Sequence, residues 1–362
     1  MPTNRYLLYI SQNYSYAILR PLQEAIKARG DEVAWFLEGS EVNPSYLKKT
    51  ENQLLTIAQV KEYNPKAIFY PSSIAPNFLP GINVSVFHGF DAGKVDKRGN
   101  NDHFKIRNCF DLYCTQGPST TLPFQALVKG KNHFKVIETG WCALDSLYLN
   151  EKALKENKSK NEALIDSLKE TYRKPTILLC STFSKKLSCA PHLFETVKKL
   201  SESGKWNWIV QFHPKMPIDI VNQYKSIQNS NLSFVETDDV IPLLQQADVM
   251  VCDTSSVLIM FLLLGKPVVT YKNISPENYL IDIDNPEVLE QSIENALTKP
   301  KELMANIKQY IDDTHPYSDG HSSERVLDAV EEVLSGKFNL QKKPYDFFRN
   351  FKMRKRLKYW KV

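Results

Sequence analysis

ADVMVCDTSSVLIMFLLLGKPVVTY, residues 247–271, is the segment that reveals the architecture of the chain most directly. It reads as a buried strand at 249–252, a polar turn at 253–256, an apolar helix at 257–264 and a second strand at 268–271. A short continuous apolar run that is followed at once by a longer one is typical of a βαβ unit in a parallel sheet. The segment therefore predicts an α/β fold.

The polar turn of this unit has two interpretations. Gly265 and Pro267 end the helix, so the turn lies at its N-terminus, on the carboxyl edge of the predicted sheet. Hydroxyl groups and free backbone N–H groups at such a place bind anions in α/β folds. The same residue types are also the commonest helix caps, so ordinary capping is the alternative. The residues concerned are Asp253, Thr254, Ser255 and Ser256.

The composition is that of a soluble globular protein with room for two domains. The chain has 362 residues, of which 42% are hydrophobic and 24% are charged. No apolar run is long enough to span a bilayer, and the N-terminus lacks the features of a signal peptide. The six cysteines are scattered without a CxxC pair, which favours free thiols in a reducing compartment. We therefore expect a cytoplasmic protein.

Short apolar strands alternate with helices in two successive blocks, which predicts two Rossmann-like domains with parallel sheets that face a central cleft. Neither block contains GxGxxG or a P-loop, so binding of a dinucleotide is not supported. The expected divisions are an N-terminal domain at 1–150, a charged linker helix at 151–173, a C-terminal domain at 174–335 and a basic tail at 336–362.

Two histidines each follow a predicted strand directly. His88, before Gly89, ends the strand at 82–87, and its ordinary pKa suits proton abstraction near neutral pH. His213, before Pro214, ends the strand at 206–212 and is a second candidate catalytic residue, placed to donate to a phosphate oxygen or to the leaving group. A histidine that merely bonds a loop carbonyl is the alternative for both.

Two further polar clusters follow the same logic. Ser181 and Thr182 come after the first strand of the second block, with lysines close behind them. The segment 319–325, DGHSSER, opens a helix and carries Arg325 in its first turn, where a cation is unfavourable unless an anion is bound. An arginine beside free N–H groups can hold a phosphate through two hydrogen bonds. A capping box with an outward arginine is the alternative.

Basic charge is concentrated at the C-terminal end. Residues 337–362 contain ten basic side chains and one acid, Asp346, while the whole chain carries +5. Aromatic residues interleave with the basic ones, a pattern typical of an interfacial helix on anionic lipid. The alternatives are nucleic-acid contact, which no accompanying DNA or RNA module supports, and packing of 347–351 on the N-terminal domain. We expect a packed start and a membrane-facing end, formed by Arg354, Lys355, Arg356, Lys358 and Trp360.

Taken together, the motifs resemble the CDP-glycerol glycerophosphotransferase family, the teichoic-acid and capsule glycerophosphate transferases with a GT-B fold. The similarity lies in the order and spacing of the motifs between about residues 80 and 335. The most specific are 253–256 with Gly265-Lys266-Pro267, and 319–325, which are similar to the family patterns D-Y-S-S…K-P and D-G-x-A-S-E-R.

The resemblance implies transfer of glycerol phosphate from CDP-glycerol to a hydroxyl of a cell-envelope glycan or lipid-linked acceptor, with release of CMP. His88 would act as general base, and His213 would hold the pyrophosphate, with Asp253 orienting His213 or contacting the donor glycerol. The other donor-binding residues would be Gly89, Ser181, Thr182, Thr254, Ser255, Ser256, Asp319, Gly320, Ser322, Ser323 and Arg325.

The basic, aromatic tail predicts an enzyme attached peripherally to the inner face of the cell membrane, with no nucleic-acid partner. No carboxylate cluster indicates a tightly held metal, so no cofactor is expected, and a loosely bound Mg²⁺ stays open. One alternative is a GT-B glycosyltransferase that uses a nucleotide-sugar, such as a CMP-activated acid sugar, in capsule or lipopolysaccharide synthesis. Another is a catalytically silent subunit of an envelope-polymer assembly.

Overall fold

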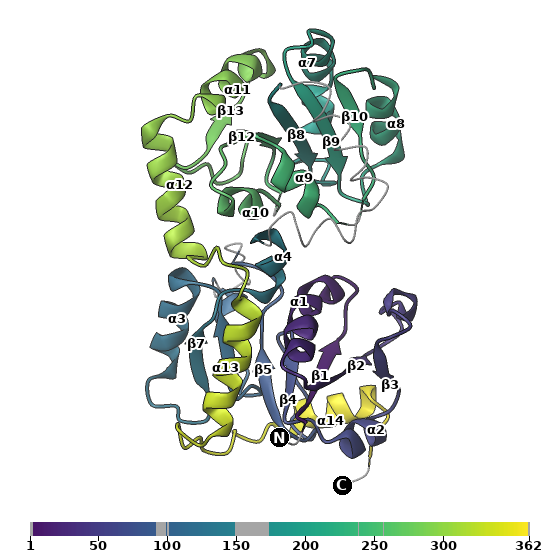
Figure 1. The fold of residues 1–362 in the computed structure, drawn as a ribbon, viewed down its shortest axis with the longest axis vertical. Coiled ribbons are helices and arrows are strands. Elements are labelled where there is room, and N and C mark those ends of the chain that lie inside the picture. Colours follow the sequence, from purple (N-terminus) through teal and green to yellow (C-terminus); the bar gives the residue numbers. More distant parts are fainter. Residues whose placement is uncertain are drawn as a thin grey trace. The chain divides into compact units, whose positions relative to one another are not determined.

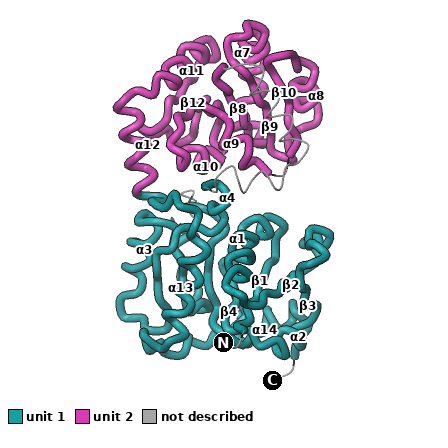
Figure 2. Tube along the Cα trace, viewed as in Figure 1, with its two compact units in different colours: residues 1–149, 313–362 teal, residues 150–312 magenta. Residues whose placement is uncertain are grey.

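The chain forms two compact units. The computed structural model describes residues 3–91, 99, 101–148, 174–237, 239–255 and 257–360. Unit 1 comprises residues 1–149 and 313–362, and unit 2 comprises residues 150–312 (Figure 2). The predicted linker helix at 151–173 lies outside the described residues.

Unit 1 is built on a parallel sheet of seven strands in the order β3-β2-β1-β4-β5-β6-β7 (Figure 1). The chain runs outward from β1 to β3 on one side and then returns to β4 on the other. The gap between β1 and β4 is therefore the topological switch point, where open α/β sheets bind ligands. The strands are β1 (Arg5–Ile10), β2 (Glu32–Leu37), β3 (Asn52–Leu54), β4 (Ala67–Tyr70), β5 (Ile82–Ser85), β6 (Leu112–Thr115) and β7 (Lys135–Glu138).

Helices cover both faces of this sheet, which explains why its strands are apolar almost throughout. Because side chains alternate along a strand, Leu7 and Tyr9 of β1 join one core, together with residues of α2, α3 and the C-terminal segment. α1 and α13 pack against each other (Figure 1). The helices are α1 (Ser15–Ala28), α2 (Ile57–Tyr63), α3 (Pro118–Val128), α4 (Asp145–Tyr148), α13 (Ser322–Leu334) and α14 (Phe347–Arg356).

Unit 2 contains a second parallel sheet, of six strands in the order β10-β9-β8-β11-β12-β13, so its switch point lies between β8 and β11. The strands are β8 (Thr176–Ser181), β9 (Asn207–Phe212), β10 (Leu232–Phe234), β11 (Val249–Cys252), β12 (Val268–Tyr271) and β13 (Ile281–Ile283). The helices are α7 (Ala190–Glu202), α8 (Ile218–Ser226), α9 (Ile241–Gln246), α10 (Val257–Leu263), α11 (Leu289–Leu297) and α12 (Lys301–Thr314).

The βαβ unit at 247–271 is confirmed. β11 and β12 pair in parallel on either side of α10, with Met250 opposite Val268. Gly265 follows α10 with φ of 68°, a left-handed conformation that suits glycine after a helix.

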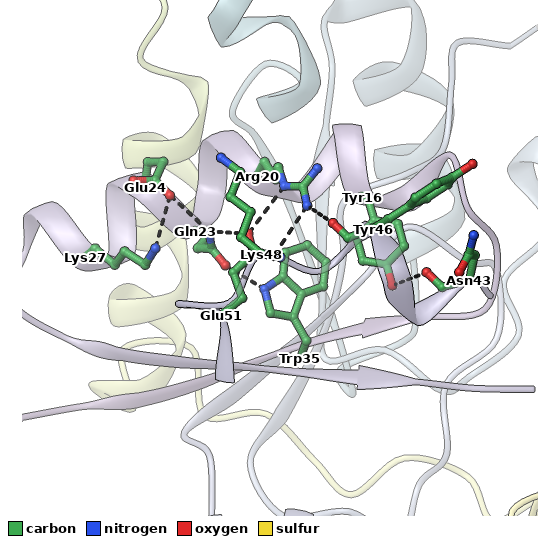
Figure 3. A network of polar contacts seen from close by, with 10 residues as sticks. All are labelled: Tyr16, Arg20, Gln23, Glu24, Lys27, Trp35, Asn43, Tyr46, Lys48 and Glu51. Atoms are coloured by element: carbon green, nitrogen blue, oxygen red, sulfur yellow. Dashed lines mark hydrogen bonds and ion pairs between the residues drawn. The ribbon is translucent and has the colours of Figure 1, made fainter. Parts of the chain in front are cut away.

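A buried carboxylate holds the long loop between β2 and β3 against α1 (Figure 3). Glu51 accepts hydrogen bonds from Arg20 Nε at 3.3 Å, Gln23 Nε2 at 3.0 Å and the backbone N–H of Lys48 at 2.8 Å. Burial favours a higher pKa for Glu51, but these hydrogen bonds outweigh it and lower the pKa of the carboxyl. The loop and the short edge strand β3 are fixed by this network.

One predicted domain boundary is wrong. Residues 313–335 were expected in the C-terminal domain, but they belong to unit 1. α13 packs on α1, where Arg29 bonds Asp328 at 2.6 Å and Glu331 at 3.2 Å. The helix–strand alternation that continues into this segment is compatible with either domain, so only long-range contacts decide its place.

The pattern also left several elements unassigned. These are β3, α2, α3, β13 and α12, most of them short or rich in polar residues. Over the described parts of the chain, no helix is long and apolar enough to cross a membrane.

Candidate active site

In unit 2, a buried aspartate in the loop after β11 is hydrogen-bonded to the loop after β8, and both loops lie at the switch point of the sheet. Asp253 follows β11 and is fully buried. Its carboxylate accepts hydrogen bonds from Ser181 Oγ at 2.7 Å, from the backbone N–H of Thr182 at 3.0 Å and from that of Cys189 at 3.0 Å. Cys189 is the N-cap of α7, so one carboxylate fixes the ends of β8 and β11 and the start of a helix.

This placement corrects the role expected for Asp253. The carboxylate was predicted to orient His213 or to contact the donor glycerol, but both of its oxygens accept bonds from Ser181, Thr182 and Cys189. Ser181 is buried as well, and its hydroxyl also lies 2.8 Å from Ser188 Oγ. Asp253 and Ser181 therefore fix the conformation of these loops.

His213 is exposed at the end of β9, beside the loop that follows β8. Its ring lies 4.5 Å from the ring of Phe183, and the Lys215 ammonium lies 5.7 Å from the same aromatic ring. His213 Nδ1 accepts the backbone N–H of Lys215 at 3.0 Å, so the neutral ring carries its proton on Nε2. Partial burial, and secondarily the charge of Lys215, lower the pKa of His213. The ring is thus a neutral N–H donor at this edge of the sheet.

The rest of the turn after β11 is fixed by the loop after β12. Thr254 Oγ1 accepts the backbone N–H of Ile274 at 3.2 Å, and Asn273 Nδ2 donates to the carbonyl of Asp253 at 3.2 Å. Ser255 accepts the N–H of Leu258 through its carbonyl at 3.2 Å, which leads into α10. Ser256 lies outside the described residues.

In unit 1, His88 lies at the carboxyl edge of the sheet, after β5. His88 Nδ1 is 3.1 Å from the carbonyl oxygen of Pro71, at the end of β4, and the ring lies 6.2 Å from that of Tyr14, which follows β1. A carbonyl can only accept, so Nδ1 carries the proton of the neutral ring and Nε2 keeps its lone pair. His88 therefore presents a proton acceptor, the opposite tautomer to His213.

The residue before His88, Phe87, has a strained backbone conformation that sets the direction of the chain at the histidine. Phe87 has φ of 58°, a left-handed conformation that is rare for a bulky side chain and occurs mainly where surrounding contacts enforce it. Its ring is buried, and its carbonyl accepts Trp141 Nε1–H at 3.3 Å. Gln116 Nε2 donates to the carbonyl of Gly89 at 2.8 Å on the other side of His88. The loop is therefore held from both sides.

The segment 319–325 also belongs to unit 1, and its donors are already engaged. The backbone N–H groups of Ser322 and Ser323 each donate to a different oxygen of Asp145 at 2.8 Å. Arg325 bonds Asp319 through two nitrogens at 2.8 and 2.9 Å and the carbonyl of Thr139 at 2.9 Å. The pair with Arg325 lowers the pKa of Asp319.

These contacts give the segment 319–325 a structural role, and the phosphate clamp expected there stays a prediction. Asp145 occupies the position at the N-terminus of α13 that an anion would take, and Asp319 pairs with the Arg325 guanidinium. Gly320 is buried with φ of 75°, so it shapes the turn before the helix. The motif docks α13 onto the sheet of unit 1.

A buried histidine that the sequence analysis did not single out, His315, lies just before the segment 319–325. His315 Nε2 accepts the backbone N–H of Trp141 at 2.9 Å, and burial lowers the pKa of His315 to about 4. Gly140 approaches so closely that a Cβ there would lie 2.5 Å from Ser322 Oγ. The His-Pro pair at 315–316, which repeats that at 213–214, was the available signal. Asp145 offered none, because its partners lie 177 residues away.

The structure therefore groups the expected site residues differently from the sequence. It brings Ser181, Thr182, His213, Asp253, Thr254 and Ser255 together in unit 2. It places His88 and Gly89 in unit 1 together with Asp319, Gly320, Ser322, Ser323 and Arg325. Among the described side chains, no group of three or more His, Cys, Asp or Glu could hold a metal ion.

Two parallel, Rossmann-like sheets with polar loops at their switch points define the class, an α/β protein of GT-B type. The family model described as UDP-N-acetylglucosamine 2-epimerase matches residues 118–331, more than half of the chain, and the chain belongs to this family.

Similar solved structures agree on the fold. A protein from Listeria monocytogenes assigned as a UDP-N-acetylglucosamine 2-epimerase superposes with a TM-score of 0.63 at 14% identity, covering 95% of this chain and 99% of its own. The wall teichoic acid polymerase TagF superposes with a TM-score of 0.61 at 13% identity, covering 93% of this chain and 90% of its own. At these identities the similarity establishes the fold alone.

One curated relative is similar in sequence. The teichoic acid glycerol-phosphate primase of Bacillus subtilis (strain 168) is 29% identical over 199 residues, which cover 52% of this chain. The match covers 50% of the primase, so the chain spans about half the length of the curated relative that it matches. This relative confirms the resemblance to glycerol-phosphate transferases that the motifs indicate.

Proposed function

We propose that this chain transfers glycerol phosphate from CDP-glycerol to a hydroxyl of a cell-envelope glycan or lipid-linked acceptor and releases CMP. The proposal is supported by the sequence similarity to a teichoic acid glycerol-phosphate primase and by the fold shared with TagF. The observation that carries it is the opposite tautomers of His88 and His213, since the reaction needs one proton acceptor and one N–H donor.

Unit 2 binds the donor in this proposal. The Nε2–H of His213 donates to a pyrophosphate oxygen, and the Lys215 ammonium adds positive charge at the same edge. The exposed ring of Phe183 offers an apolar face beside them. Asp253 contributes by fixing the loops that carry these groups, so they need little reorganisation when the donor binds.

His88 of unit 1 is the general base. Its Nε2 takes the proton of the acceptor hydroxyl while that oxygen attacks the phosphorus that bears glycerol. A new P–O bond forms to the acceptor, and the P–O bond to CMP breaks. The hydrogen bond from Nδ1 to Pro71 holds the required tautomer, and it stabilises the imidazolium once the proton has been transferred.

Arg325, Ser322 and Ser323 have no role in donor binding in this proposal, because their donors are bonded to Thr139, Asp319 and Asp145. The expectation that no metal is required stays a prediction. Treatment with a chelator should leave the rate of CMP release unchanged.

The test compares three donors with the full chain. CDP-glycerol, UDP-N-acetylglucosamine and CMP-Kdo are each incubated with the protein and a cell-envelope lipid extract, and the nucleotides and modified acceptors are identified. We expect CMP and a glycerol-phosphate-modified acceptor from CDP-glycerol alone. CMP released only from CMP-Kdo would identify a glycosyltransferase and refute the proposal.

Membership of the epimerase family supports a second candidate, conversion of UDP-N-acetylglucosamine to its 2-epimer. The same assay distinguishes the two. Epimerisation needs no acceptor and yields a new UDP-sugar, whereas the proposed transfer depends on the acceptor and yields CMP. A 2-epimer formed without acceptor would favour the epimerase.

A further inference from the structure

The C-terminal helix α14 directs its aromatic side chains away from the unit on which it packs. Phe347, Phe348, Phe351 and the following Trp360 are 62%, 77%, 48% and 54% exposed. Their rings touch one another: Phe347 lies 5.8 Å from Phe348 and 6.4 Å from Phe351, and Phe351 lies 5.4 Å from Trp360. They form a contiguous group, which we call the aromatic face.

The arrangement follows from the helical repeat. Residues Asn350, Met353 and Leu357, at spacings of three and four, lie on one side of the helix and pack against unit 1. At about 100° per residue, 348 and 351 fall on the opposite side and 347 lies on the flank between the two sides. A helix that served only to cover the core would place its phenylalanines inward. Here an asparagine and a methionine are buried and three phenylalanines are exposed.

The contacts of α14 with unit 1 fix which side faces outward. Arg349 bonds the carbonyl oxygens of Arg107 and Asn108, and Lys343 pairs with Asp111. The Arg354 guanidinium lies 4.4 Å from the ring of Phe78. Tyr359 stacks on the same ring at 6.1 Å. The helix cannot turn its aromatic face inward without breaking these contacts.

Positive charge surrounds the aromatic face. Lys352 and Lys355 lie on the same side of the helix, and Lys342 and Lys358 flank it; all four are exposed. Asp346, the one acid between 337 and 362, caps α14 through the N–H of Arg349 at 2.9 Å. Phenylalanine and tryptophan with a lysine border match the boundary between the acyl chains and head groups of an anionic bilayer.

We propose that the aromatic face is a docking surface for an anionic phospholipid bilayer. The rings would enter the boundary between head groups and acyl chains, with Lys352 and Lys355 beside lipid phosphates. The proposal keeps Lys355, Lys358 and Trp360 of the expected membrane-facing set and omits the two arginines, because Arg354 lies over Phe78 and Arg356 pairs with Glu38 in the fold. It does not depend on the proposed reaction.

The test is cosedimentation of the full chain with phosphatidylcholine vesicles, either pure or with about one-third phosphatidylglycerol. We expect binding to the anionic vesicles and about tenfold or more weaker binding to the neutral ones. Phe348→Ser with Phe351→Ser should weaken binding about tenfold or more, by removing apolar area. Lys352→Ser with Lys355→Ser should weaken it about 25-fold, since each lysine contributes about a factor of five at low salt.

The matched control removes two exposed apolar side chains of unit 2, Ile218→Ser with Ile274→Ser, which should change binding by no more than about twofold. All of the replaced side chains are exposed, so the urea unfolding of each variant should match that of the parent. Two results would overturn the proposal: no binding of the parent to anionic vesicles, or binding that both the aromatic and the lysine variants retain. Self-association that the aromatic substitutions abolish, without vesicle binding, would assign the face to a second protein chain instead.

Discussion

The partner of a single ring nitrogen distinguishes the two histidines that follow strands, His88 and His213. His88 Nδ1 faces a carbonyl oxygen, whereas His213 Nδ1 faces a backbone N–H. The first contact leaves Nε2 as an acceptor, and the second leaves Nε2 as a donor. Each role follows from the chemistry of one backbone group.

Replacement of these rings should therefore have different kinetic effects. His88→Ala should lower turnover by about two orders of magnitude or more, because it removes the proton acceptor, while affinity for CDP-glycerol persists. His213→Ala should mainly weaken donor binding. The measurements are kcat from CMP release and Kd for CDP-glycerol by calorimetry. Loss of donor binding in His88→Ala with normal turnover would contradict the assignment.

Buried His315 should make the protein sensitive to mild acid. Its pKa is lowered to about 4, while that of an unfolded histidine is about 6.5. Between these values the unfolded chain binds a proton that the folded chain does not, so stability falls as the pH falls. The free energy of unfolding should drop by about 2 kcal/mol between pH 7 and pH 5.

Urea unfolding at both pH values checks this, and the variant His315→Gln should flatten the difference, because its amide oxygen can still accept the N–H of Trp141. His321→Gln is the control, since this histidine is exposed. An unchanged pH dependence in His315→Gln would show that another group titrates.

At the scale of elements, one carboxylate joins three parts of unit 2. Asp253 bonds the end of β8, the following loop and the N-terminus of α7. An asparagine would keep the shape but would turn an N–H₂ group toward these donors. Asp253→Asn should therefore cost about 2–4 kcal/mol of unit 2 stability, because buried donors lose their acceptor.

Hydrogen exchange measured along the chain checks this prediction. Protection should fall in β8, β11 and α7, and the strands of unit 1 should keep theirs. Asp219→Asn, an exposed aspartate on α8, is the control and should leave exchange unchanged. Equal loss of protection in unit 1 would refute a role confined to this sheet.

At the scale of the whole molecule, unit 1 is discontinuous. The chain leaves it at residue 149 and returns at 313, and the returning segment supplies α13 and α14. Met353 of α14 is buried, and Leu357 packs on the core that contains Tyr9 and Tyr70. The C-terminal segment is therefore part of the fold of unit 1 as well as a surface.

Ending the chain after Gly336 should destabilise unit 1 alone. Removal of α14 uncovers apolar side chains and frees the carbonyl oxygens of Arg107 and Asn108, so unit 1 should lose about 3 kcal/mol or more. Hydrogen exchange should increase in β1 and β4 and stay constant in β8 and β9. Unchanged protection in β1 would mean that α14 contributes no stability.

The sequence by itself determined the class of fold, the parallel strands, and the positions of His88, His213 and Asp253 at strand ends. These features are local. Apolar periodicity, a glycine after a helix and polar residues after a strand can each be recognised in a stretch of about ten residues. The βαβ unit at 247–271 is an example, because its local pattern alone predicted the parallel pairing of β11 and β12.

Only the tertiary structure decided which of these residues share a unit and which groups remain available. Asp145 accepts hydrogen bonds from the backbone N–H groups of Ser322 and Ser323, which lie 177 and 178 residues further along the chain. Asp253 accepts hydrogen bonds from the backbone N–H groups of Thr182 and Cys189. The pattern around 319–325 is equally compatible with binding a phosphate or a carboxylate of the chain itself. Which anion satisfies a helix N-terminus depends on long-range packing, and local sequence does not encode that packing.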